Sequence, residues 1–230
     1  FFGYMMAHPG KKLLFMGQDF GQFIECDEKK PLDWMLLGYD KHRELQSYVR
    51  DLNHFYRATP ALRQVDYSWE GFQWIVPDDS KQSVIAFLRR DAAGKMVLVV
   101  CNFNPVLRKE YQMGVPNPGS YKEILNSDDK KYGGSGGTNG TVKTKKGPMH
   151  GFDQHISLTL PPLSTLYLRV PAARKPRAAT AEDTAAETPA MPAANMTSKT
   201  TAKTAAPAAD AGTEAAPKRR GRPPKAKTTV

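Results

Sequence analysis

Cysteine is scarce in this chain of 230 residues, which contains only Cys26 and Cys101. The two lack the short paired spacing of a disulfide framework or a zinc site, so neither is expected. Long apolar runs are absent too, because no window approaches the ~18 apolar residues of a membrane-spanning helix. The opening stretch lacks the basic region and cleavage site of a signal peptide, so a cytoplasmic location is expected.

Signals for a metal or a nucleotide cofactor are equally sparse. The five histidines include no pair at metal-ligand spacing with a third ligand nearby. The glycine-rich stretch at residues 133–140 is not followed by Gly-Lys-Ser/Thr, so it predicts a flexible inter-strand connection instead of a phosphate loop. The residues therefore indicate neither a metal site nor a phosphate loop.

Positive charge gathers at the end of the chain. Residues 173–230 hold 11 Lys and Arg against 5 Asp and Glu, which gives +6 of the overall net charge of +10. Residues 172–230 are rich in Ala, Pro, Thr and Lys and contain no aromatic residue. Such a segment cannot bury enough apolar surface to offset the cost of ordering its backbone, so a disordered tail is expected.

One stretch of this tail has a pattern of its own. Arg220, Gly221, Arg222 and Pro223, flanked by further cations, resemble an AT-hook, which lies in the A·T minor groove. The alternative is a basic tail that attracts polyanions loosely and loses them in salt. The sequence favours the loosely binding basic tail, because one hook makes few phosphate contacts. Weak contact of the tail with DNA or another polyanion is therefore a hypothesis.

Residues 61–171 carry mainly strand signals. Short apolar or alternating runs are separated by turn residues such as Pro77-Asp78-Asp79. Candidate strands cover residues 72–76, 83–90, 96–103, 109–115, 120–126, 154–160 and 164–170. Seven short strands at this spacing predict an all-β antiparallel sandwich domain. Cys101 is expected to be a small buried apolar group within it.

Residues 1–60 have a different pattern. An apolar run at residues 11–17 predicts a buried strand, residues 18–40 a long loop, and residues 41–57 an amphipathic helix. This is the pattern of one terminal unit of a β/α architecture, and a strand that ends in polar residues is typical of the active-site rim of an α/β barrel. A barrel strand is not stable alone, so we expect the chain to be the C-terminal part of something larger.

Two polar clusters are candidate sites. Gln18 and Asp19 follow the predicted strand at the end that faces substrate in a barrel, and an amide beside a carboxylate suits sugar hydroxyls. Asp33 and Trp34 form the second cluster, in which the indole would stack on a sugar ring while the carboxylate binds a hydroxyl. The alternative for the first cluster is an exposed turn from strand to loop with no binding role. The alternative for the second is that Trp34 only fixes its loop to the body of the domain.

An ordered series of motifs along residues 1–171 resembles a known family, the bacterial 1,4-α-glucan (glycogen) branching enzymes of the α-amylase superfamily. The series begins with Leu13-Leu14-Phe15-Met16-Gly17-Gln18-Asp19-Phe20-Gly21-Gln22 and Leu32-Asp33-Trp34. It continues with the motifs at residues 45–53, 70–75, 99–106, 123–128 and 158–163. The tail has no counterpart in this pattern.

The resemblance implies the last β/α unit of a (β/α)₈ TIM barrel at residues 1–60 and the family's C-terminal β-domain at residues 61–171. It also implies an enzyme that cuts an α-1,4 link in a glucan and transfers the released oligoglucan to a 6-hydroxyl, by a retaining mechanism with two carboxylates and without an organic cofactor or metal redox chemistry. A monomer is expected. In that family the catalytic carboxylates lie upstream of the Gly17–Phe20 motif, so no catalytic residue is assigned and the chain is expected to be inactive alone.

By the same resemblance, Gln18, Asp19, Asp33 and Trp34 are expected to line the rim of the substrate cleft. Asp19 stands where the family more usually has glutamate. A glucan hydrolase or debranching enzyme of the same superfamily is the alternative, although the β-domain motifs argue against it.

Overall fold

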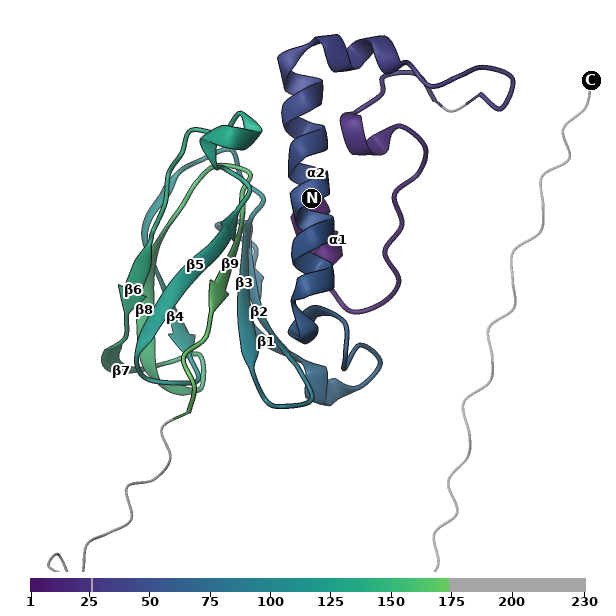
Figure 1. Ribbon diagram of the computed structural model, residues 1–230. Helices are drawn as coiled ribbons and strands as arrows, with labels where there is room; N and C mark the ends of the chain where they lie inside the picture. Colours follow the sequence, from purple (N-terminus) through teal and green to yellow (C-terminus); the bar gives the residue numbers. More distant parts are fainter. Residues whose placement is uncertain (26, 174–230) are drawn as a thin grey trace, which may run out of the picture. The chain divides into compact units, whose positions relative to one another are not determined.

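The computed structural model describes residues 1–25 and 27–173. These residues all belong to the first of two compact units, Phe1–Arg177, whose chain runs from helices into strands (Figure 1). The disordered tail expected from residue 172 lies, from residue 174 onward, outside the described residues. In the described ranges, no helix is long and apolar enough to cross a membrane.

Helical elements come first. They are α1 (Phe2–Ala7), η1 (Gln18–Phe20), η2 (Trp34–Gly38), α2 (Asp40–Ala58) and η3 (Pro60–Leu62). The helix predicted at residues 41–57 is confirmed as α2, which buries Tyr48, Val49 and Leu52 along one stripe. Asp40 in its first turn and Arg57 in its last complement the helix dipole.

The strands of the described residues form two antiparallel sheets, one with the order β1-β2-β3-β9-β5-β6 and one with the order β4-β8-β7. Their bounds are β1 (Phe72–Asp79), β2 (Val84–Arg90), β3 (Met96–Asn102), β4 (Arg108–Val115), β5 (Ser120–Asn126), β6 (Thr141–Lys143), β7 (Lys145–Met149), β8 (Phe152–Leu160) and β9 (Thr165–Arg169). Two further short turns, η4 (Trp69–Gly71) and η5 (Lys130–Tyr132), precede β1 and β6.

The prediction of an all-β antiparallel domain is confirmed, and all seven predicted strands are present. Strands β6 and β7 were not predicted, because they are short, rich in lysine and interrupted in β7 by Gly147 and Pro148. Strand β1 also runs past Pro77, which is tolerated because β1 is an edge strand and its register against β2 shifts between Val76 and Asp79.

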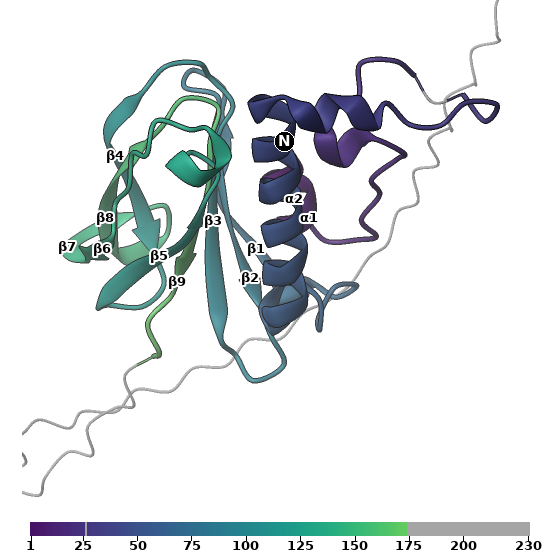
Figure 2. The same cartoon turned by 45° about the horizontal axis from the view of Figure 1, so that its top comes forward.

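Each face of the six-stranded sheet buries its own apolar cluster. One cluster lies between the two sheets and includes Leu98, Val100, Ile156 and Leu158, which makes a sandwich. The other joins α1 and α2 to the opposite face. Figures 1 and 2 show α1 and α2 on that face of the sheet, with β4 and β8 on the other side.

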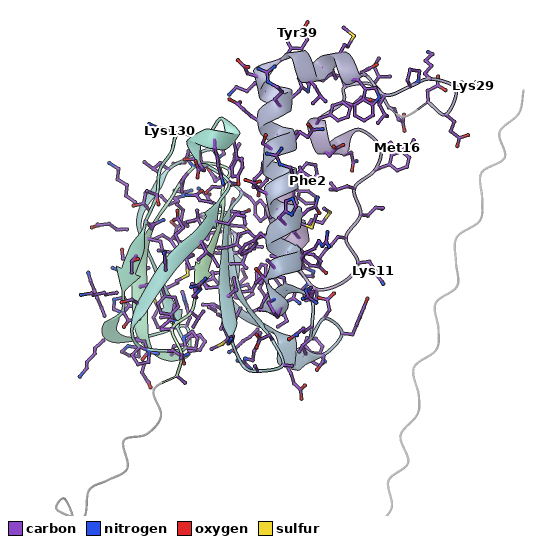
Figure 3. All side chains as sticks on the ribbon, in the orientation of Figure 1. Phe2, Lys11, Met16, Lys29, Tyr39 and Lys130 are labelled. Carbon is purple, nitrogen blue, oxygen red and sulfur yellow. The ribbon has the colours of Figure 1, made fainter. Side chains whose placement is uncertain are left out.

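The strand predicted at residues 11–17 is wrong. These residues form an irregular segment, and Leu13, Phe15 and Met16 are 74%, 54% and 53% exposed. A barrel strand needs hydrogen-bonded neighbours on its two sides, and every strand of the described residues pairs elsewhere. Figure 3 shows Lys11 and Met16 on a loop beside α2, away from the sheets.

Cys101 is completely buried in β3, as the sequence predicted. Burial raises the pKa of its thiol to about 12 and outweighs the hydrogen bond from Thr165, which lowers that pKa. The thiol is therefore protonated and shielded, and is not a nucleophile at neutral pH.

This thiol predicts a pH dependence of stability. In the unfolded chain a thiol ionises near pH ~8.5, but folded Cys101 holds its proton until about pH 12. Between these two pH values, ionisation of the thiol in the unfolded chain lowers the free energy of unfolding by roughly 1.4 kcal/mol for each unit that the pH rises. Urea titrations between pH 9 and 11 should therefore show a shallower loss of stability for Cys101→Ala than for the parent chain. Equal slopes would contradict the assignment.

Candidate functional site

The segment Gly17–Gln22 folds into a closed turn. Gly17 adopts a left-handed φ of 79° and precedes η1. The backbone N–H of Gln22 donates to the Gly17 carbonyl at 2.9 Å. A Cβ at Gly17 would lie 2.8 Å from the Gln22 Cβ, so glycine is required for space as well as for φ. The turn encloses Phe20, whose side chain is completely buried.

Helix α2 anchors this turn. The His42 ring Nδ1 lies 2.7 Å from the Phe20 carbonyl oxygen, and because a carbonyl only accepts, Nδ1 carries the proton. Gly21, at a φ of 71°, lets the backbone approach Leu45 so closely that a Cβ would lie 2.9 Å from its Cδ2. The helix stripe therefore positions the polar turn.

The two predicted site clusters meet at Phe20. The Trp34 ring lies 5.3 Å from the Phe20 ring at an interplanar angle of 31°, while 55% of Trp34 stays exposed. Asp19 precedes Phe20 in the chain and Asp33 precedes Trp34, and both aspartates are half-buried. Trp34 thus pins its own loop and still presents apolar surface, so the two readings of this tryptophan are compatible.

Gln22 joins the clusters and was missed as a site residue by the sequence reasoning. Its Oε1 accepts the Asp33 N–H at 2.9 Å, and its Nε2 donates to the Ile24 carbonyl at 2.9 Å. An amide has a donor and an acceptor, so it can tie two loop segments together where a carboxylate could not. Its position at the end of a glycine-flanked turn was the available signal.

Gln18 takes part differently. Its Oε1 accepts the Phe15 N–H at 2.9 Å, so the carbonyl oxygen serves the turn. Gln18 also lines a hollow of about 500 Å³, whereas Asp19, Asp33 and Trp34 do not. The other lining residues are mostly apolar: Phe1, Phe2, Met5, Leu13, Phe15, Gly21, Gln22 and Leu45. The four predicted residues therefore do not converge on one cavity.

The glycine-rich segment at residues 133–140 connects η5 to β6, as predicted, but it is fixed by hydrogen bonds. The Asp128 carboxylate accepts the N–H groups of Ser135 and Gly137 at 3.0 and 3.2 Å. Glu123 accepts Thr138 Oγ1 and the Asn139 N–H at 2.9 and 3.1 Å. These amides point at the protein's own carboxylates. In the described part of the chain, no group of three or more His, Cys, Asp or Glu could hold a metal.

Sequence comparison identifies the relatives of this chain. Residues 74–171 match the family described as the α-amylase C-terminal all-β domain. The 1,4-α-glucan branching enzyme GlgB of Aquifex aeolicus is 55% identical over 170 residues, 73% of this chain and 27% of that enzyme. The GlgB of Halothermothrix orenii is 50% identical over the same shares, and that of Aromatoleum aromaticum 52% identical over 73% and 26%.

Among solved structures, the Group B Streptococcus pullulanase SAP is 14% identical over 74% of this chain and 27% of its own, with a TM-score of 0.46. That similarity is too low to support an argument. The chain spans about a quarter of the length of the branching enzymes that it matches. Residues 74–171 are similar to the α-amylase C-terminal all-β domain, and the matched part of the chain is similar to a segment of the bacterial 1,4-α-glucan branching enzymes.

Proposed function

We propose that this chain forms the C-terminal part of a 1,4-α-glucan branching enzyme, which moves an α-1,4-linked oligoglucan to a 6-hydroxyl and so makes an α-1,6 branch. Identity of about 50% to several GlgB enzymes carries this proposal. The reaction needs a carboxylate nucleophile and a carboxylic acid on opposite sides of the scissile bond. We assign neither to this chain, and propose that both come from upstream barrel strands.

We propose further that residues 1–60 complete such a barrel and residues 61–171 form the β-domain. The exposed apolar side chains of the N-terminal segment support this. Phe1, Leu13, Phe23, Ile24 and Met35 are 67–80% exposed, and the hollow beside α1 is also mostly apolar. Several large exposed apolar side chains in one segment suit burial against another part of a protein.

The polar groups of the Gly17–Gln22 turn and of Asp33-Trp34 would then lie at the rim of the glucan cleft. The exposed face of Trp34 offers a stacking surface for a pyranose ring, and the Asp19 and Asp33 carboxylates accept hydrogen bonds from hydroxyls. A cytoplasmic monomer remains a prediction. So does DNA or polyanion contact through residues 220–223, which lie outside the described residues.

A chimera tests the proposed activity. Residues 1–171 would replace the matching C-terminal segment of the Aquifex aeolicus enzyme, and branching of amylose would be followed by the fall in iodine absorbance. The chimera should branch amylose, and the isolated chain should not. Branching by the isolated chain, or a folded but inactive chimera, would contradict the proposal.

The same chimera tests the rim. Asp19→Ala and Trp34→Ala are each expected to lower kcat/KM for amylose by about tenfold, because each removes one contact of roughly 1–2 kcal/mol. Trp69→Ala, which removes a 90% exposed indole outside the rim, is the control. Unchanged kcat/KM in both rim variants would remove these residues from the substrate cleft.

A further inference from the structure

A second hollow, of about 460 Å³, lies in the β-domain where the edge strands of the two sheets approach each other. Its wall comes from the end of β1, the turn before β2, the middle of β4 and the turn before β8. Unlike the hollow beside α1, it is lined mainly by polar side chains, among them Asp78, Gln82, Lys109, Glu110, Gln112 and His150.

Both edge strands are irregular at this hollow. The register of β1 against β2 shifts between Val76 and Asp79, and that of β4 against β8 shifts between Arg108 and Tyr111. Glu110 lies within the second shift and has a φ of 55°, a left-handed conformation that non-glycine residues rarely adopt. Bulges redirect side chains and are enriched at binding sites, and a strained residue persists where its surroundings hold it.

Hydrogen bonds hold the wall in place. The Asp79 carboxylate accepts the Tyr111 hydroxyl at 2.9 Å and the Gln82 N–H and Nε2 at 3.2 and 3.1 Å. His150 Nδ1 accepts the Gly114 N–H at 3.3 Å, so the neutral ring carries its proton on Nε2 and keeps a donor. Arg108 donates from Nη2 to the Gln82 carbonyl, and its buried Nε has no partner in the described part.

Several polar side chains of the wall remain available to a ligand. Lys109, Glu110 and Gln112 are exposed and make no side-chain hydrogen bond or ion pair with other described residues. They offer an ammonium donor, a carboxylate acceptor and an amide with both functions. Mixed donors and acceptors around a hollow match vicinal hydroxyl groups, which donate and accept at once.

We propose that this hollow is a glucan-holding site of the β-domain, in which Lys109, Glu110, Gln112 and His150 bind the hydroxyls of a short α-1,4-linked glucose segment. The choice of an α-glucan rests on the proposed function. The site is separate from the rim in sequence and in the elements that form it. Binding is weak, because the one aromatic residue of the wall, Tyr111, is 7% exposed and offers no stacking face.

Titration of the full chain with maltoheptaose, followed in ¹H–¹⁵N NMR spectra, tests this site. Amide shifts are expected at residues 109–112 and 150. The double variant Glu110→Gln/His150→Ala should weaken binding about tenfold, since it removes hydrogen bonds of which one is charge-assisted. Lys145→Ala, which removes an exposed cation from the same sheet outside the wall, should bind like the parent chain.

Glu110→Gly separates the role of this side chain from its backbone strain. Glycine adopts a φ of 55° without penalty, so the melting temperature should rise by about 2–4 °C while maltoheptaose binding weakens. Higher stability with unchanged binding would overturn the proposal, as would shifts confined to residues 18–34. Failure of maltoheptaose to bind a folded chain would also overturn it, and would leave the branching activity of the chimera as a separate result.

Discussion

Replacing Arg89 with alanine is expected to lower the free energy of unfolding by about 3–5 kcal/mol, because a buried ion pair would lose one partner. Arg89 is completely buried, and its Nη2 donates to Asp66 Oδ1 at 2.7 Å. Its Nε donates to the Gly71 carbonyl at 3.2 Å and its Nη1 to the Ala7 carbonyl at 2.5 Å. Alanine would leave the Asp66 carboxylate without its ion-pair partner and the two carbonyls without this donor.

The effect should extend beyond β2, since this network joins three parts of the chain. The other carboxylate oxygen of Asp66 accepts the Gly10 N–H at 3.1 Å. The pair therefore fixes the end of α1 and the loop after it to the sheet. Loss of Arg89 is expected to loosen residues 7–12 before the sandwich unfolds, which hydrogen exchange would detect as faster exchange at Gly10.

Urea denaturation measures this loss, and Arg90→Ala is its neighbouring control. Arg90 is half-buried, and its only side-chain hydrogen bond in the described part is a weak one from Nη2 to the Met96 sulfur at 3.7 Å, so a loss of about 0.5 kcal/mol or less is expected. The double variant Arg89→Met/Asp66→Asn should be less destabilised than Arg89→Ala, because no uncompensated charge is left. A loss below about 1 kcal/mol for Arg89→Ala would show that water reaches Asp66.

Sequence reasoning recovered the elements whose patterns depend on burial of one face. The stripe of α2 and the alternation of β8 follow from periodicity, and the run Val97–Cys101 follows from its apolar character, because β3 is buried on its two faces. It failed for residues 11–17, where Leu13, Phe15 and Met16 are mostly exposed to solvent instead of buried in a core. An apolar run indicates that its side chains need burial, but it does not identify the part of a protein against which they pack.

The candidate site was recovered in part for a similar reason. Residue type selected Gln18, Asp19, Asp33 and Trp34. In the structure, the ring of Trp34 packs against the ring of Phe20, which follows Gln18 and Asp19 in the chain. Periodicity could not reveal Gln22 or His42, since their roles depend on single hydrogen bonds across 11 and 22 positions of the chain. Contacts of this kind are set by tertiary packing, and the periodicity of a sequence does not report them.

Gly17→Ala in the branching chimera is expected to lower kcat for amylose by about 10²-fold, because it displaces the groups of the Gly17–Gln22 turn from their positions at the rim. Alanine at Gly17 would have a φ of 79° and a Cβ 2.8 Å from that of Gln22 and 2.9 Å from its Oε1. To relieve this clash Gln22 must move, and it would then release the Asp33 N–H. Both rim clusters would shift together.

Gly94→Ala provides the matched control. Gly94 has the same φ of 79°, but it lies in the turn before β3 with no atom within 4 Å of the added Cβ. It therefore reproduces the left-handed strain of about 1–2 kcal/mol without the clash. Gly94→Ala should lower the melting temperature of the chimera and leave kcat unchanged, whereas Gly17→Ala should lower both. Equal kcat values for the two variants would mean that the Gly17–Gln22 turn does not position groups that contact the glucan.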